Sequence, residues 1–447
     1  MKQTYIQSIK QKHMIKVYLK QALTLMKQHR LFSGIYILGT GLSIALVMTL
    51  FIIFYVKFAP IYPEYNRNRI LVLKDVKRVS KQNEGNWSLN SGASWYVVKE
   101  LMANLQHCEA LAAANLDEWN DYRISLPDGG NLKVAANFTN SDFWRVFNFN
   151  YVEGHPYTSE QIEAKEPVAV LSASLSKRLF ATTATVGRKF FFNGKEFTVC
   201  GVVEDVSNAT PETVGDLWVP LTHSSWITRE YDSDNLMGSL HLFFLAPSAS
   251  DKEALRNEIL EVIHKYNQQN EHYVHDVFEQ PDEYWLSTFR SGFVDAQVTP
   301  WNVLKSHLIT LLAFLIIPAL NLSGMISSRM DSRMAEIGVR KAYGATDRSL
   351  VSQVLWENLL LTCIGGLVGL LLSYLIVLMA SDWILTLFDA FIMFPGKEYK
   401  LTFEMLFNPV VFTSALLFCV ILNLFSALIP TVWALRRSII SAIHAKR

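Results

Sequence analysis

The sequence predicts a membrane protein with four transmembrane α-helices and a large α+β extracytoplasmic domain between the first and second helices. Three observations predict this class. Half of the 447 residues are hydrophobic and only 18% are charged, against about 25% in soluble proteins. Four stretches without charge each exceed the length of about 20 residues that crosses a bilayer. Basic residues are concentrated in three of the segments that flank these stretches.

The four charge-free stretches define the predicted transmembrane helices. Their apolar runs are longer than those of ordinary buried helices in soluble proteins. The first run is also too long for a cleaved signal peptide, and about 30 residues precede it, so it is expected to stay as an anchor. The predicted helices cover 31–57, of which 31–56 is free of charge, 306–328, 358–381 and 405–435.

The distribution of lysine and arginine predicts the orientation. The segments 1–30, 329–357 and 436–447 are rich in these residues and are predicted to be cytoplasmic. The domain 58–305 and the short loop 382–404 then lie outside. Both termini are therefore expected in the cytoplasm, as four alternating spans require.

The segment 1–30 contains an amphipathic stretch from Met14 to Met26. Apolar residues occupy one helical face of this stretch and lysines occupy the other. This pattern is typical of a helix that lies on the membrane surface. The alternative is a helix that packs on a partner protein.

The extracytoplasmic domain is predicted to mix strands and helices. Strands are expected over 69–76, 167–172, 189–206 and 240–246, and helices over 95–105, 172–180 and 251–268. Within 189–206 the letters NGKE separate two β-rich runs and predict a hairpin. Ser250 is the expected N-cap of the last helix. Cys108 and Cys200 lie in this domain, where a disulfide is chemically allowed, but the sequence does not place them together.

The sequence shows no constellation for catalysis, and we assign no catalytic residue, cofactor, metal ligand or nucleic-acid partner. Nucleotide-binding, hydrolase and zinc-protease motifs are absent. His272 and His275 could share a helix face near acidic residues, but two histidines fall short of a metal site and fit an exposed polar surface. An anchored enzyme is therefore disfavoured.

The interiors of the predicted transmembrane helices hold no Asp, Glu, Lys or Arg. A transporter coupled to protons or ions usually needs such groups, so secondary transport is disfavoured. The polar and small residues of these helices fit helix packing, with a substrate path as the alternative. The packing residues are Gly365, Gly366, Gly369, Asn321 and Asn423.

The polar segment from Ser327 to Leu350 separates the second and third predicted spans. Gly344 is expected to end one helix, and Thr346 is expected to cap the next. The segment is then a bent helical connection. It either only sets the topology or acts as a rigid lever that another protein holds, and the residue pattern leaves both open.

The stretch MAEIGVRKAYGATDRSLVSQVLWENLLLTCIGGLVG (334–369) resembles the FtsX-like, or MacB-like, ABC transporter permeases. Nine residues match in register a family motif that joins the second and third spans: Glu336, Ile337, Gly338, Val339, Arg340, Lys341, Ala342, Gly344 and Ala345. Tyr343 fills the variable position of the motif. Residues 143–158 and 166–206 are similar to the periplasmic core domain of this family, although the ATTATVGRK turn departs from its usual pattern.

The resemblance implies a docking role for the segment 329–357. In the family this segment contacts an ATPase, so the residues implied to couple it are Glu336, Gly338, Arg340, Lys341, Gly344, Ala345 and Thr346. About 30 residues precede the first span, so the ATPase is expected on a separate subunit. The resemblance also implies a second permease chain, identical or paralogous, and leaves room for a periplasmic partner.

The sequence thus predicts the membrane subunit of an ATP-binding cassette complex in the inner membrane of a bacterium. It would transmit ATP-driven conformational change to its periplasmic domain for export or extrusion, with no ATP hydrolysis of its own. The alternative is a membrane-anchored sensor or scaffold whose outer domain binds a ligand or partner. The sequence leaves open whether the task is export, lipoprotein extraction or hydrolase activation, and names no substrate.

Overall fold

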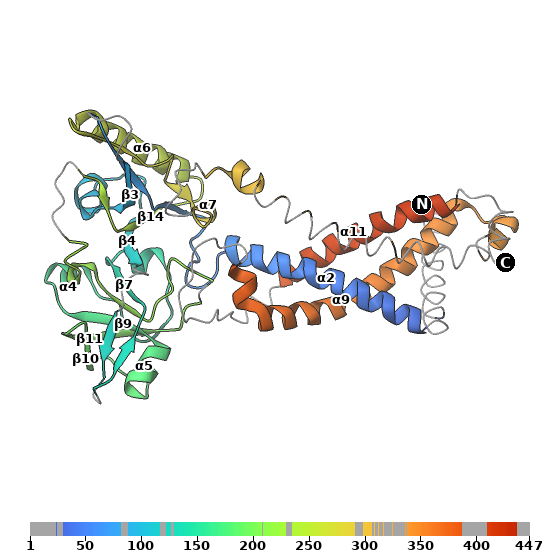
Figure 1. The fold of residues 1–447 in the computed structure, drawn as a ribbon, viewed down its shortest axis with the longest axis horizontal. Helices are drawn as coiled ribbons and strands as arrows, with labels where there is room; N and C mark the ends of the chain where they lie inside the picture. The colour runs from blue at the N-terminus through green and yellow to red at the C-terminus, as the bar shows by residue number, and fades with distance from the viewer. Residues whose placement is uncertain are drawn as a thin grey trace, which may run out of the picture. The chain divides into compact units, whose positions relative to one another are not determined.

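We describe the fold from a computed structural model of the chain (Figure 1). The chain forms two compact units, which we treat separately: a helical unit made of Met1–Tyr55, Leu304–Ile384 and Thr402–Arg447, and a domain made mainly of Val56–Val303. The structure describes residues 24, 30–81, 88–116, 122–126, 129–207, 209–228, 235–290, 298–305, 338–386 and 409–435, with 308, 312, 316, 324 and 336 as isolated positions.

The helical unit contains the long apolar helices α2 (Arg30–Phe58), α9 (Asp347–Thr386) and α11 (Pro409–Leu435). Among the described residues, three helical stretches have the length and apolar composition to cross a membrane: Ser33–Phe58, Asp347–Met379 and Pro409–Ser426. They overlap the first, third and fourth predicted spans. The second predicted span, 306–328, falls almost wholly outside the described residues, as do most of 1–30, the loop 387–404 and the tail 436–447.

Helix α9 runs without a break from Asp347 into the third predicted span. This agrees with the expectation that a new helix follows Thr346. The sequence between 347 and 357 contains no proline or glycine that would interrupt it. The third apolar stretch is therefore continuous with a polar first part of the same helix.

The domain is built on two β-sheets, and this confirms the predicted α+β class. A 12-stranded sheet has the order β16-β1-β14-β4-β7-β12-β9-β11-β10-β5-β6, with β8 paired to β11, and a 4-stranded sheet has the order β13-β3-β2-β15. The strands are β1 (Ile70–Leu73), β2 (Val76–Ser80), β3 (Ser88–Ala93), β4 (Ala110–Leu116), β5 (Arg123–Ser125), β6 (Asn131–Lys133), β7 (Ala136–Thr139), β8 (Tyr151–Gly154), β9 (Val168–Ser172), β10 (Lys189–Phe192), β11 (Lys195–Val203), β12 (Leu217–Pro220), β13 (Met237–Gly238), β14 (His241–Leu245), β15 (Tyr273–Asp276) and β16 (Asp282–Glu283).

The larger sheet is buried on both faces. In β1, Leu71 and Leu73 belong to one hydrophobic core while Ile70 and Val72 belong to the other. Side chains alternate across a strand, so an unbroken apolar run such as ILVL supplies both cores. This explains why the run reads as continuously hydrophobic in the sequence.

The predicted hairpin of 189–206 is confirmed. Strand β10 pairs antiparallel with β11, and Phe192 lies opposite Lys195. The two residues between them, Asn193 and Gly194, both have positive φ, of 45° and 77°. A two-residue hairpin turn of this kind favours Asn-Gly because both positions are left-handed.

One long helix and several short ones complete the domain: the π-helix Val97–Leu101, α3 (Phe143–Val146), α4 (Ser159–Glu163), α5 (Ala173–Phe180), the 3-10 helix Leu221–His223, α6 (Lys252–Gln269) and α7 (Tyr284–Ser287). The predicted helices near 172–180 and 251–268 are confirmed. The predicted N-cap of α6 is wrong by one residue: Asp251 occupies the N-cap position rather than Ser250, and its side chain makes no capping hydrogen bond. The Asp251 carboxylate instead accepts a hydrogen bond from the Ser248 hydroxyl.

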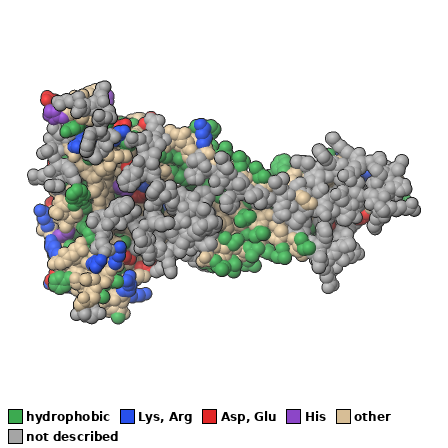
Figure 2. All heavy atoms as spheres, viewed as in Figure 1, with side chains coloured by type: hydrophobic (Ala, Val, Ile, Leu, Met, Phe, Trp, Pro, Cys, Tyr) green, Lys and Arg blue, Asp and Glu red, His purple; other side chains and the backbone are tan. Residues whose placement is uncertain are grey.

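The surfaces of the two units differ in chemistry (Figure 2). Large apolar side chains are exposed on the helices, among them Leu371, Met379 and Val410 at 70–80% exposure. Such a surface suits a lipid environment. Charged side chains gather instead on the surface of the domain.

Candidate functional site

The candidate site is the bend that joins the helical residues 338–342 to α9. The helix ends in a Schellman motif at Gly344, whose φ is +91°. The amide of Ala345 donates to the carbonyl of Arg340 at 3.0 Å, and the amide of Gly344 donates to that of Lys341 at 2.9 Å. This hydrogen-bond pair defines the motif, and glycine suits its left-handed position. The helix stop predicted at Gly344 is confirmed.

The next helix begins immediately. The Thr346 hydroxyl accepts from the amide of Ser349 at 3.3 Å, which confirms the predicted cap. The Lys341 ammonium lies 2.7 Å from the Asp347 carboxylate, so an ion pair spans the turn. Asp347 also lies in the first turn of α9, where a negative charge interacts favourably with the helix dipole.

A second connection spans the bend through Arg340. Its guanidinium donates to Gln353 on α9 at 2.6 Å and to Glu336 on its own helix at 2.6 Å. Gln353 is buried, whereas Arg340 and Glu336 are about 40% exposed. The charged residues of the motif therefore bond to one another and to α9, and they hold the bend.

The outward surface of the bend is apolar in part. The side chain of Tyr343 is 89% exposed and that of Val339 is 48% exposed. They lie four positions apart and therefore on one face of the helix end. Gly338 is buried, and Ala345 is half-buried. The bend is held by the ion pairs Arg340–Glu336 and Lys341–Asp347. It exposes one aromatic and one aliphatic side chain to solvent.

The predicted packing glycines lie at close helix contacts within the helical unit. A Cβ at Gly369 would lie 2.7 Å from the Gly41 carbonyl of α2, and one at Gly365 would lie 3.0 Å from Thr40. Gly366 faces α11, where a Cβ would meet the end of Leu416. Small residues at such positions let helix backbones approach.

Asn423 on α11 donates its side-chain amide to the hydroxyl of Thr362 on α9, and both residues are buried. Asn358, the first residue of the predicted third span, and Glu357 just before it are also buried on α9. The prediction for Asn321 lies outside the described residues.

The interpretation of His272 and His275 as a pair on an exposed helix face is wrong. His275 lies on strand β15 and is 1% exposed. Its ring accepts a hydrogen bond from the amide of Leu236 at 3.3 Å and packs edge-on against the ring of Tyr266. Within the described ranges, no group of three or more His, Cys, Asp or Glu residues could hold a metal ion.

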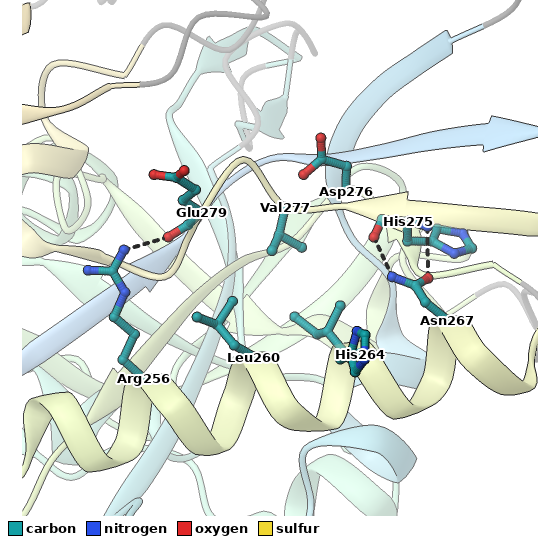
Figure 3. A pocket seen from close by; sticks show the side chains of 9 residues that line it. Arg256, Leu260, His264, Asn267, His275, Asp276, Val277 and Glu279 are labelled. Carbon is teal, nitrogen blue, oxygen red and sulfur yellow. Dashed lines mark hydrogen bonds between the residues drawn. The ribbon is translucent and has the colours of Figure 1, made fainter. Parts of the chain in front are cut away.

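A groove of about 450 Å³ runs between α6 and the segment 275–279 (Figure 3). Several of its polar groups bond to the protein itself: Arg256 donates to the carbonyl of Glu279, and the Asn267 side chain bonds the backbone of His275 in both directions. We assign no ligand to it.

Sequence reasoning missed a group of buried charges in the domain. Glu64, Arg67, Lys74, Glu212, Asp282 and Arg290 are each at most 10% exposed as side chains. Burial raises the pKa of the nearby Asp75 carboxyl. Burial alone would raise the pKa of Glu212 as well, but Lys74 and His241 hold it at about 2. Buried ion pairs leave no periodic pattern in the sequence. The only sequence signal that could have suggested them is the high density of charged residues in PEYNRNRILVLKD (63–75).

The fold combines helices of membrane-spanning length and apolar composition with a large α+β domain. The MacB-like periplasmic core domain profile matches residues 33–262, more than half of the chain, and the FtsX-like permease C-terminal profile matches residues 308–439. The chain therefore belongs to the family of MacB-like and FtsX-like ABC transporter permeases.

Curated relatives agree with this family. The ABC transporter permease YknZ of Bacillus subtilis is 24% identical over 245 residues, 54% of this chain and 56% of YknZ. The pyoverdine export ATP-binding/permease protein PvdT of Pseudomonas aeruginosa is 23% identical over 52% of this chain and 33% of its own length. The macrolide export ATP-binding/permease protein MacB of Hahella chejuensis is 25% identical over 54% and 35%. The matches thus span about half of YknZ and about a third of the other two.

Two solved structures also match. The extracellular domain of YknZ aligns with a TM-score of 0.33 and 12% identity over 46% of this chain and 99% of that domain. A domain of a permease protein from Porphyromonas gingivalis aligns with a TM-score of 0.34 and 17% identity over 48% and 94%.

Proposed function

We propose that this chain is the membrane subunit of an ATP-binding cassette complex that transmits ATP-driven conformational change to its extracytoplasmic domain. The transmitted motion serves export or extrusion of a substrate. The chain spans the inner membrane four times with both termini in the cytoplasm. It pairs with a second permease chain, identical or paralogous. ATP hydrolysis belongs to a partner ATPase.

The observation that carries this proposal is the exposed bend at Val339 and Tyr343. The positive-inside rule supports a cytoplasmic location of the bend, where an ATPase would be. Its charged residues are engaged in bonds within the bend, so we expect a partner to contact the exposed apolar pair. Aromatic side chains are frequent anchors of protein interfaces. MacB and PvdT, whose names combine ATP-binding and permease functions, support an ATPase as that partner.

The helix contacts support the transmission of motion rather than flow through a pore. Gly41, Gly365 and Gly369 bring α2 and α9 into backbone contact. Ile44, Val47 and Met48 of α2 also form one core with Ala415 and Cys419 of α11. Tightly packed helices move as a group, so a displacement of α9 at the bend would reach α2.

The test is co-purification of the tagged full-length chain with candidate ABC ATPases of its genome, beginning with any encoded beside it. The readouts are association in detergent and ATP turnover. Tyr343→Ala should weaken the association at least about tenfold, the effect of losing an interface contact of about 1.4 kcal/mol. Tyr343→Phe should retain most of it.

Trp226→Ala is the matched control, because Trp226 is an exposed aromatic residue, 63% exposed, in the extracytoplasmic domain. It should leave the association unchanged. If no ATPase co-purifies with the unmodified chain, the proposed function fails. An anchored sensor or scaffold then becomes the interpretation to pursue.

A further inference from the structure

Aromatic side chains gather in the domain where the chain enters it from the first apolar helix. The end of α2, from Val56 to Phe58, belongs to the compact unit of the domain. The Phe58 ring lies 5.5 Å from the Trp285 ring and 6.4 Å from the Phe289 ring. The rings of Trp285 and Phe289 are 6.5 Å apart. Two segments that are distant in the sequence therefore form one aromatic group at this point of the domain.

A further aromatic side chain marks the point where the chain leaves the domain. Trp301 lies in the first turn of a helix that precedes the predicted second span, 306–328. Thr299 caps this helix, because its hydroxyl accepts from the amide of Asn302 at 3.2 Å. Pro300 follows the cap at the first helical position, which proline favours. The Trp301 side chain is 61% exposed.

The position of these residues along the chain sets their distance from the bilayer. The apolar stretch Ser33–Phe58 has 26 residues, which measure about 39 Å as a helix. The hydrocarbon core is about 30 Å thick, and the headgroup regions extend the bilayer to about 40–45 Å. A span centred in the bilayer therefore places Phe58 in a headgroup region. The rings of Trp285 and Phe289, which pack on Phe58, lie next to that region.

The chemistry of these side chains suits the headgroup region. Aromatic side chains, tryptophan above all, are enriched there because an apolar ring and a polar edge can both be accommodated. The Phe58 ring is 42% exposed, so an apolar surface is open at the end of the helix. The indole N–H of Trp285 donates to the Glu283 carboxylate at 3.2 Å, which satisfies the polar edge of that ring.

The charged groups near these rings each have a partner within the domain. Glu283 pairs with Lys252 at 3.1 Å, and Arg290 pairs with Asp282 at 2.7 Å. The Lys57 ammonium lies 5.0 Å from the centre of an aromatic ring. A contact made at this surface therefore depends on the rings more than on charge. This favours the lipid interface over a strongly charged protein as the occupant.

We propose that Phe58, Trp285, Phe289 and Trp301 form an aromatic collar that binds the boundary between lipid headgroups and acyl chains on the side of the domain. The occupant is the lipid surface, because the chain itself brings the collar to it: α2 ends at Phe58, and the predicted second span follows Trp301. The collar goes beyond the proposed function, since it binds lipid whether or not an ATPase is present.

The first experiment measures collisions of a spin label with oxygen, which concentrates in lipid, and with a water-soluble nickel chelate. The full-length chain is placed in lipid nanodiscs after Cys108 and Cys363, the cysteines that are not buried, are replaced by Ser. The label is attached in Trp301→Cys or in Trp226→Cys. These positions are a matched pair, because both are tryptophans of the domain with 61% and 63% exposure. The ratio of oxygen to nickel collisions should be at least about threefold higher at 301 than at 226.

The second experiment tests the rings themselves by tryptophan fluorescence. Phospholipids that carry bromine near the headgroup quench a tryptophan that touches them. Trp301→Phe and Trp285→Phe should each remove a quenched component of the emission, whereas Trp226→Phe should remove an unquenched one. Phenylalanine keeps an apolar ring at each position, so the domain should still fold. Added salt should leave the quenching unchanged, because rings rather than charges make the contact.

Three outcomes overturn the collar. The label at 301 could meet the nickel chelate as often as the label at 226, which would place both in water. It could be shielded from both reagents, which would mean that a protein partner or a second copy covers the surface. The quenched component could be the same in Trp301→Phe, Trp285→Phe and Trp226→Phe. No ATPase is present in either experiment, so these outcomes are separate from those of the co-purification.

Discussion

Arg340 donates a 2.6 Å hydrogen bond to Gln353, and so connects the helix before the bend to a buried residue of the helix after it. Gly344 and Thr346 lie between them and form the turn. The arginine of the family motif therefore makes its hydrogen bonds within its own chain. The charged side chains of the motif fix the angle between the two helices. We expect the exposed side chains of Val339 and Tyr343 to contact a partner.

Removing this connection should loosen the bend with little effect on overall stability. Arg340→Ala loses the bonds to Gln353 and Glu336, and these partly exposed interactions are worth less than about 1 kcal/mol. Hydrogen exchange of the amides of residues 341–346 should become at least several-fold faster. Arg348→Ala, at an exposed position in the first turn of α9, is the control. Unchanged exchange in Arg340→Ala would contradict the role of the bond.

Substitution of Gly344 should destabilise the turn, because residue 344 has a left-handed backbone conformation. A Cβ there meets nothing within 4 Å, so the penalty of Gly344→Ala comes from the φ of +91° alone. That penalty is about 1 kcal/mol, and Gly344→Asn should lose less, because Asn adopts this conformation more readily. The co-purification assay measures this penalty as a fall in ATPase association. A gain in association by Gly344→Ala would show that the turn is not needed as seen.

Two neighbouring glycines of α9 should respond differently to alanine. At Gly369 the new Cβ would lie 2.7 Å from the Gly41 backbone carbonyl, which cannot move without separating α2 from α9. At Gly366 it would meet the flexible end of Leu416 at 2.7 Å. Gly369→Ala should therefore destabilise the helical unit by about 1–3 kcal/mol, and Gly366→Ala by clearly less. Thermal unfolding in detergent compares them, and equal melting temperatures would refute the close contact.

The domain should lose stability in acid through Glu212. Burial would raise the pKa of this carboxyl, but Lys74 and His241 hold it at about 2, below its ordinary value of 4.5. A lowered pKa stabilises the folded state above about pH 4.5, and this contribution of about 3 kcal/mol is lost as the pH falls toward 2. Glu212→Gln should be less stable than the unmodified chain at pH 7 because Lys74 loses its partner.

Melting curves between pH 3 and 7 measure this effect. The difference between Glu212→Gln and the unmodified chain should shrink as the pH falls. Asp142→Asn, at a more exposed ion pair, is the control and should follow the unmodified chain. A constant difference across the whole range would contradict the assignment.

Cys108 and Cys200 should remain reduced thiols of low reactivity. Both are free in the structure, and burial raises the pKa of Cys108 to about 11 and that of Cys200 to about 12. The thiolate is the reactive form, so both should alkylate slowly at pH 7 until the chain is denatured. Mass spectrometry after iodoacetamide treatment measures the extent of alkylation of each cysteine. A 108–200 disulfide peptide from non-reduced protein would contradict it.

The sequence alone determined the features that depend on local chemistry. Apolar runs indicated the long helices, Asn193 and Gly194 the hairpin turn, and Gly344 with Thr346 the bend. Each is a short-range property, because hydrophobic length, left-handed φ and helix capping act over a few residues. The family motif between residues 336 and 345 is equally local.

Only the tertiary structure decided which charges are buried and what they hold. Glu64 and Tyr284 are 220 positions apart and meet inside the domain, and His275 is enclosed by side chains from other elements. In the sequence such residues resemble a solvated surface, because burial of a charge depends on partners that folding brings from a distance. The bend was predictable from its own residues, whereas the buried group of Glu64, Arg67 and Tyr284 exists only once the domain has folded.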